Sequence, residues 1–244
     1  MLLDLAKADA VEVAPEYIRR AQSEGRTLMT SQPEELMVLL FATEARSDDD
    51  NHLRNALAAS IDAAAINNVV LQGSGEPSGA LLPNWLSGYG FLFSTAPSLE
   101  RKAERPSQAK HSPTWSLSYD ASDPLAHLVA ERILLNARDS GIALQLVTSG
   151  TSDLRLIRIP LSSLCPQVAL AALARTFQVA QPKFANGSIT ELYSAENTLL
   201  KSHRIIPLFH MRSAFALRSN VHNWNVLANG ELQLGSVWLS VEKP

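Results

Sequence analysis

The stretch LMVLLFATEARSDDDNHLRNALAASIDAAA, residues 36–65, decides the fold. Its first eight residues, 36–43, form a nearly continuous apolar run of strand length, which is typical of a strand buried on both faces of a sheet. The acidic cluster 47–51 follows, and its short side chains can accept hydrogen bonds from the free N–H groups at the start of a helix. Apolar residues then recur at helical spacing over residues 53–64. A buried strand followed by a capped, alanine-rich helix predicts an α/β protein.

Strand and helix patterns continue on both sides of this stretch. We expect its helix to extend through residues 66–71 and to end at the glycine-rich segment 73–79, and residues 83–112 to form a loop. Further strands are predicted at residues 115–119, 142–147, 154–159, 205–209, 213–217 and 232–239, with 205–209 and 213–217 paired to each other. Further helices are predicted at residues 16–23, 124–139, 167–177 and 189–201, with one more short helix before Pro15.

Composition excludes several classes of protein. With 244 residues, 46% of them hydrophobic and 18% charged, the chain can bury a core and is not of the disordered class. The formal net charge of -3 argues against nucleic acid as a partner, because such binders usually carry a basic excess. Cys165 is the single cysteine, so a disulfide framework or a two-cysteine metal site cannot form within one chain.

Membrane and targeting signals are not found in the sequence. Residues 1–9 lack the basic and long apolar regions of a signal peptide, and no apolar run has the length of a membrane span. We therefore expect the chain as given to be soluble.

The motifs that suggest chemistry do not match the spacing that the chemistry needs. Gly73, Gly75 and Gly79 differ from a phosphate-binding loop and follow a helix rather than a strand. Asp48–Asp50 lacks the spacing of a calcium loop, and the six histidines form no zinc motif. We expect no metal, no cofactor and no catalytic residue.

Two other classes of function stay open at this point. A hydrolase would use Ser78 or Cys165 as its nucleophile together with a histidine. A stand-alone interaction module would present an apolar surface that a partner or a second copy covers. For either a binding cleft or a core, the residues best suited by ring area are Trp85, Trp115, Trp224 and Trp238.

Four stretches, taken in order, resemble the C-terminal half of the family 5 extracellular solute-binding proteins, the receptors of peptide, nickel and related ABC importers. The first is KADAVEVAP at residues 7–15, which is similar to the family segment GKADVVEVPP. The second is NHLRNALAASID at residues 51–62, which is similar to the pattern D-x-x-VR-x-ALAYAID. The third runs from LSY at 117–119 to GIAL at 141–144, and the fourth joins LYSAEN at 192–197, IPL at 206–208 and VWL at 237–239.

This resemblance implies a fold and a division of the chain. The fold would be a periplasmic-binding-protein-like lobe, a mixed β-sheet flanked by helices, and the second lobe of a two-lobed clamp. Residues 1–34 would be a remnant of the first lobe that leads into the hinge, 35–210 the second lobe, and 211–244 the return strands toward the first lobe. Residues 36–43 and 211–217 would be the hinge strands.

The same resemblance implies a function. The chain would capture a peptide-like or other small solute by closure of the clamp and deliver it to an ABC permease, in the periplasm or outside the cell. Contact with the membrane would be only through that permease or a lipid anchor of the longer parent protein. The ligand-facing residues implied by position in the family's cleft loops are Trp85, Tyr89, Arg158, Ser162 and Ser163. One departure concerns the ligand: Ile159 and Ser162 stand where peptide receptors carry a tryptophan and the aspartate that pairs with the peptide's amino group. Since a neutral hydroxyl does not balance an ammonium, we expect either a different ligand or a different charge partner.

Overall fold

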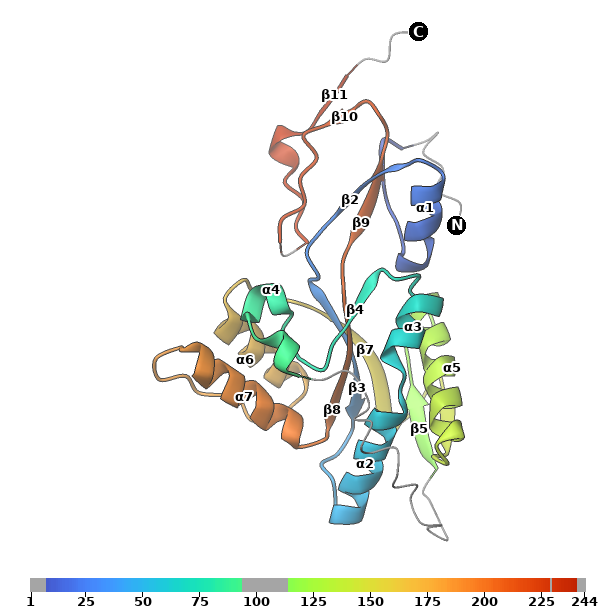
Figure 1. Cartoon of the computed structure of the whole chain (residues 1–244), viewed down its shortest axis with the longest axis vertical. Helices are drawn as coiled ribbons and strands as arrows, with labels where there is room; N and C mark the ends of the chain where they lie inside the picture. The colour runs from blue at the N-terminus through green and yellow to red at the C-terminus, as the bar shows by residue number, and fades with distance from the viewer. Residues whose placement is uncertain (1–7, 94–113, 229, 241–244) are drawn as a thin grey trace.

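The two larger of three sheets organise the described part of the protein. The computed structural model describes residues 8–93, 114–228 and 230–240. Within them, a six-stranded sheet (the large sheet) has the order β4-β8-β3-β7-β5-β6, and a three-stranded sheet (the small sheet) has the order β1-β9-β2. Figure 1 shows the large sheet and its helices below, and the small sheet above. The molecule is therefore elongated, with a broad part and a narrow part.

Strand β3, Glu35–Phe41, is the buried centre of the large sheet. Its side chains alternate between two apolar clusters, as the period of a strand requires. One cluster receives Leu36, Val38 and Leu40, and the other receives Met37, Leu39 and Phe41. All six are at most 2% exposed. The prediction of a strand covered on both faces is confirmed.

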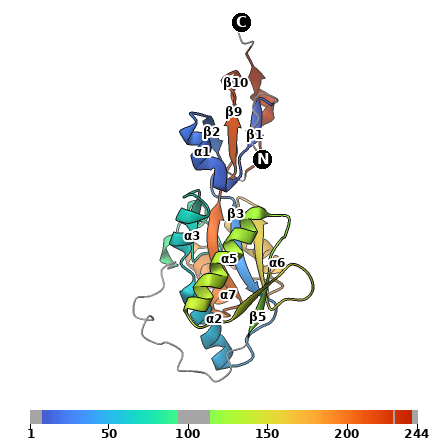
Figure 2. The ribbon, with the colours of Figure 1, turned by 90° about the vertical axis from the view of Figure 1, so that its right-hand side faces the viewer.

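Helices cover both faces of the large sheet. One face carries α2 (Asp48–Ser60), α3 (Ala63–Val69) and α5 (Pro124–Asp139). The other carries α4 (Asn84–Ser87), α6 (Pro166–Thr176) and α7 (Ile189–Lys201). Figures 1 and 2 show these two groups on opposite sides, with α5 in front of the sheet in Figure 2.

The large sheet mixes both kinds of strand pairing. Strand β3 is antiparallel to β7 (Leu154–Pro160) and to β8 (Ile205–Met211), and β8 is antiparallel to β4 (Gly75–Pro77). Strand β5 (Trp115–Ser118) is parallel to both β7 and β6 (Leu144–Val147). The expected α/β lobe, a mixed sheet flanked by helices, is confirmed.

Local capping signals set the helix starts. Ser47 Oγ accepts a hydrogen bond from the Asp50 amide at 3.2 Å, and Asp123 Oδ1 accepts one from the Leu125 amide at 2.9 Å. The expected helix through residues 66–71 is interrupted instead. The backbone leaves the helical region at Ile61, and the Asp62 carboxylate caps a new helix by accepting from the Ala65 amide at 2.8 Å.

The small sheet joins segments from the two ends of the chain. Strands β1 (Ala10–Glu12) and β2 (Thr27–Thr30) both pair with β9 (Ala214–Leu217), antiparallel to it. The turn η1 (Pro15–Tyr17) and helix α1 (Ile18–Ser23) lie between β1 and β2. Its small core is made by Val13, Ile18, Ala21, Ala214 and Ala216.

Several expectations for this region were wrong. Ala10–Glu12 is a strand rather than part of a helix, while residues 1–7 lie outside the described residues. Strands β8 and β9 do not pair with each other, because the chain changes sheet at residues 212–213. The predicted strand 232–239 is reduced to β11 (Trp238–Leu239), paired with β10 (Val221–His222), after the turn η4 (Leu234–Ser236).

The predicted loop at residues 83–112 is partly helical. It contains α4 and the turn η2 (Gly90–Leu92), and residues 94–113 lie outside the described residues. The glycine-rich segment before it forms the short edge strand β4 rather than a loop alone.

Candidate functional site

Two short segments, residues 31–34 and 212–213, connect the two sheets, and we call them the junction. The end of the large sheet at Glu35, Pro160 and Met211 faces it, since Glu35 is in register with both other residues. We call this end the junction edge. The carboxyl ends of β7 and β8 and the first turn of α5 lie here (Figure 1). Open α/β sheets bind ligands outside the carboxyl ends of their strands.

Three of the five predicted ligand-facing residues gather around residues 33–35. The Trp85 indole Nε1 donates to the Pro33 carbonyl at 2.8 Å. Arg158, from β7, binds the carboxylate of Glu35. Ser162 directly follows Leu161, whose amide donates to the Glu34 carbonyl at 2.6 Å. The fold therefore brings together residues that lie up to about 130 positions apart in the sequence.

Arg158 is held between two carboxylates. Its Nε and one terminal nitrogen donate to Glu35 Oε2 at 2.9 and 2.5 Å, and its other terminal nitrogen donates to Asp123 Oδ2 at 2.9 Å. Burial alone would lower the pKa of Arg158, but the hydrogen bonds and charges of Glu35 and Asp123 outweigh it and raise that pKa. Burial raises the pKa of Glu35, and the Arg158 contacts oppose it. With two carboxylates and one guanidinium, the ionised group has a net charge of −1.

The serines after β7 offer hydroxyl groups at the same edge. Ser162 is exposed and Ser163 is partly exposed. Ser163 Oγ accepts a hydrogen bond from the Cys165 amide at 3.0 Å, just before α6 begins. These hydroxyls can donate to or accept from a small polar ligand.

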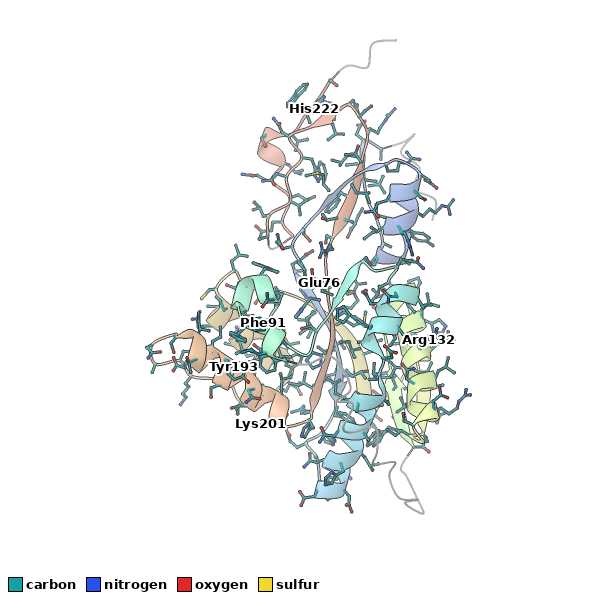
Figure 3. All side chains as sticks on the ribbon, in the orientation of Figure 1. Glu76, Phe91, Arg132, Tyr193, Lys201 and His222 are labelled. Carbon is teal, nitrogen blue, oxygen red and sulfur yellow. The ribbon has the colours of Figure 1, made fainter. Side chains whose placement is uncertain are left out.

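Tyr89 is placed differently from the other four residues. It is 3% exposed, and its hydroxyl donates to Glu196 Oε2 at 2.8 Å. Burial, followed by the charge of Glu196, raises the pKa of Tyr89. The ring also packs on Tyr193, which extends from α7 and is labelled in Figure 3, with 5.6 Å between ring centroids. Its contacts are those of a residue that fixes segment 80–93 to α7.

Glu196 and His210 form the buried polar layer beneath that segment. Glu196 accepts from the Leu81 and Leu82 amides as well as from Tyr89, and burial raises its pKa despite these bonds. His210 Nε2 lies 3.2 Å from the Leu81 carbonyl, and burial lowers the pKa of His210 to about 4. The neutral ring must donate through Nε2, because a carbonyl oxygen only accepts.

Sequence reasoning missed the partners of Arg158 and Tyr89. Asp123 directly precedes the predicted helix 124–139 and has two roles, since Oδ1 caps α5 and Oδ2 binds Arg158. Glu35 carried one signal, a carboxylate next to an apolar strand. Glu196 carried another, a charged residue on the apolar face of a helix.

The hydrolase alternative finds no geometric support. Ser78 Oγ bonds with the backbone of Ala80, and Cys165 Sγ lies 3.1 Å from Gln167 Oε1. Neither side chain is hydrogen-bonded to a histidine within the described ranges.

In the part of the chain that the structure describes, no group of three or more His, Cys, Asp or Glu side chains could hold a metal ion. None of the described helices combines the length and the apolar character that a bilayer crossing needs.

Of three comparisons with known proteins, the one with solved structures finds similar proteins. No family model matches the sequence, and no curated protein does. Among solved structures, OppA from Listeria monocytogenes bound to peptide is similar over 98% of this chain, with a TM-score of 0.74 and 14% identity. NikA from Brucella suis in complex with Fe(III)-EDTA is similar over 97%, with a TM-score of 0.73 and 16% identity. A dipeptide-binding protein from Pseudoalteromonas sp. SM9913 in complex with Met-Leu is similar over 97%, with a TM-score of 0.72 and 16% identity.

This chain matches only part of the length of each of these proteins. This chain covers 55% of the Listeria and Pseudoalteromonas proteins and 59% of the Brucella protein. The resemblance inferred from the sequence to one half of such receptors is thus met by the structure. Over 96–98% of its length, the chain has a fold similar to about half of an ABC transporter substrate-binding protein.

Proposed function

We propose that the chain is the ligand-binding lobe of an extracellular solute-binding protein of an ABC importer. In this proposal the large sheet is one jaw of a clamp, the small sheet belongs to the opposing jaw, and the junction is the hinge. Residues 35–210 form the jaw of the large sheet, and residues 1–34 and 211–244 contribute to the opposing jaw. The expected hinge strand 36–43 lies mostly within β3 of the large sheet, so we place the hinge at the junction instead. A solute that contacts both jaws stabilises the closed form and is handed to a membrane permease.

The observation that carries this proposal is the gathering of Trp85, Arg158 and Ser162 around residues 33–35. Trp85 reaches residues 33–35 from the face of the sheet that carries α4, and Arg158 reaches them from the face that carries α5, so an indole and a fixed guanidinium flank the junction edge on its two sides. Small-molecule sites combine apolar and polar groups of this kind. We propose Trp85, Arg158, Ser162 and Ser163 as solute contacts. In this proposal Tyr89 does not contact the solute. Its hydroxyl bonds to Glu196 and so holds the segment 80–93 against α7.

The first test is a thermal-shift screen of the chain against peptides, oligosaccharides, nickel and haem. A solute at a hundredfold excess over Kd adds about 2.7 kcal/mol to stability. For a domain of this size, that free energy corresponds to a rise in Tm of roughly 5–10 °C. We expect one solute class to give such a rise, and Arg158→Ala to reduce it.

Arg155→Ala is the matched control. Arg155 is an exposed arginine on the same strand β7, near the end of the sheet far from the junction. Its replacement should leave the solute-induced rise unchanged. A rise that both variants retain in full would place the solute elsewhere, and no rise with any solute would contradict solute capture by this chain.

A further inference from the structure

Glu34 is a buried carboxyl group in the junction. It is 6% exposed, although glutamate is rarely buried without compensating partners. Its Oε1 accepts hydrogen bonds from the Ser213 amide at 3.0 Å and from Ser213 Oγ at 2.6 Å, and its Oε2 accepts from Ser31 Oγ. Both serines belong to the segments that connect the two sheets. The side chain therefore bonds one connecting segment to the other.

The backbone of the same residue is bound to the large sheet. The Glu34 amide donates to the Met211 carbonyl at 2.9 Å, and the Glu34 carbonyl accepts from the Leu161 amide at 2.6 Å. These bonds extend the ladders of β8 and β7 by one residue. Glu34 thus has its main chain fixed in one sheet and its carboxylate fixed to the path toward the other.

A third segment, which carries Gly230, lies close to the Glu34 side chain. Gly230 has φ +80°, and a Cβ placed there would lie 2.9 Å from Glu34 Oε1 and 3.0 Å from Glu34 Cγ. The C-terminal segment that carries Gly230 also packs on the small sheet, since the rings of Trp224 and Phe215 have centroids 5.6 Å apart. The Glu34 carboxylate is therefore enclosed between both connecting segments and a loop attached to the small sheet.

We infer that Glu34 is a positioning residue that fixes the angle between the small sheet and the large sheet. An ordinary surface glutamate has one partner and can be lost with little effect on such an angle. Glu34 instead bonds to residues on both connections, and it adds to two direct bonds between them, from the Ser31 amide to the Ser213 carbonyl at 3.0 Å and from the Ser213 amide to Ser31 Oγ at 2.9 Å. Its removal therefore loosens the link between the two connecting segments. This inference rests on the proposed function in one respect only: the angle affects a solute if the two parts close on it.

The angle can be measured on the whole chain without any solute. Cys165 is the native cysteine, is exposed and lies at the start of α6, so it accepts one spin label. A second label at Gln22→Cys, on an exposed position of α1, reports on the small sheet. Double electron–electron resonance then gives the distribution of distances between the two parts. We expect a single narrow distribution for the unmodified junction, and a broadened or displaced one for Glu34→Ala.

Glu76→Ala is the matched control. Glu76 lies close to the junction (Figure 3), and its carboxylate pairs with Arg212 of one connecting segment, so it does not bond the two connecting segments to each other. The same loss of charge and atoms should leave the distance distribution unchanged. Ser213→Ala removes one of the hydroxyls bound to Glu34 and should change the distribution in the same direction as Glu34→Ala, by less.

The outcomes decide between a positioning role and a merely stabilising one. If Glu34→Ala folds and keeps the narrow distribution, Glu34 does not set the angle. If Glu34→Ala does not fold, Ser213→Ala decides in the same way. Because the distances are measured without solute, failure of the proposed solute capture leaves this test intact. For the solute that the screen identifies, a changed distance distribution with unchanged affinity would contradict the link between angle and capture.

Discussion

Replacement of Glu196 by alanine is expected to lower the free energy of unfolding by about 3–5 kcal/mol. Glu196 is fully buried and is the acceptor for the Leu81 amide, the Leu82 amide at 3.2 Å and the Tyr89 hydroxyl at 2.8 Å. Without the carboxylate, these three donors are left in the core with no acceptor. Urea unfolding followed by circular dichroism gives the change in free energy.

Two further variants define what the Glu196 result means. Glu131→Ala removes an exposed helical glutamate that pairs with His127, so it should cost less than about 1 kcal/mol. Tyr89→Phe removes a single donor and should cost an intermediate amount, about 1–2 kcal/mol. A Glu196→Ala variant as stable as Glu131→Ala would show that the segment at 80–93 does not depend on this carboxylate.

The second large effect is a loss of stability in acid that depends on His210. The pKa of His210 is about 4 in the folded protein, and the ordinary value is 6.5. Between these values the unfolded chain binds the proton and the folded protein does not. The stabilising contribution is therefore complete above pH 6.5 and is lost as the pH falls toward 4. Each pKa unit corresponds to about 1.4 kcal/mol, so the full loss is roughly 3 kcal/mol.

His210→Gln isolates this effect. Glutamine keeps a donor for the Leu81 carbonyl and does not titrate, so the free energy of unfolding should fall less between pH 6.5 and 4 than in the native protein. Buried groups such as Glu196, whose pKa is raised, change stability with pH in the opposite direction. Both proteins contain these groups, so subtracting one pH profile from the other cancels their contribution. His52→Gln, at an exposed position of α2, is the control. Parallel pH profiles for His210→Gln and the native protein would refute the assignment.

The elements that the sequence predicts well have local signals. Helices α2, α5 and α7 are capped by Ser47, Asp123 and Ser188, each of which accepts from an amide two or three residues ahead. Strand β3 is recognised because six consecutive apolar residues suit only an element that is covered on both faces.

The elements that the sequence predicts badly depend on partners that are distant along the chain. Ala10–Glu12 has three residues and no periodicity, and it is a strand because β9 pairs with it from about 200 residues away. The pairing of residues 205–209 with 213–217 was expected because they are neighbours in sequence. Residues 212–213 instead lead the chain from one sheet into the other.

The candidate site shows the same division. Residue type and position in the resembled family are the basis for proposing Trp85, Arg158, Ser162 and Ser163, but the groups that orient Arg158 lie on two other elements. Glu35 is 123 residues away from Arg158, and Asp123 is 35 residues away. No local pattern encodes such a pair, because it exists only once the sheet has formed. The burial of Tyr89 against Glu196 could not be foreseen for the same reason.

The most direct measurement is a nitrogen–proton correlation spectrum of the labelled chain, recorded during titration with the solute that the thermal screen identifies. Trp85, Trp115 and Trp238 each contribute an indole signal, and they lie at the junction edge, in the core beside Phe41 and on β11. If the junction edge holds the solute, the Trp85 indole and the amides of Ser162 and Ser163 shift in step with occupancy, while Trp115 and Trp238 stay in place. A saturating solute that leaves Trp85 and the two serines unmoved, or that moves Trp238 instead, would contradict solute capture at the junction edge.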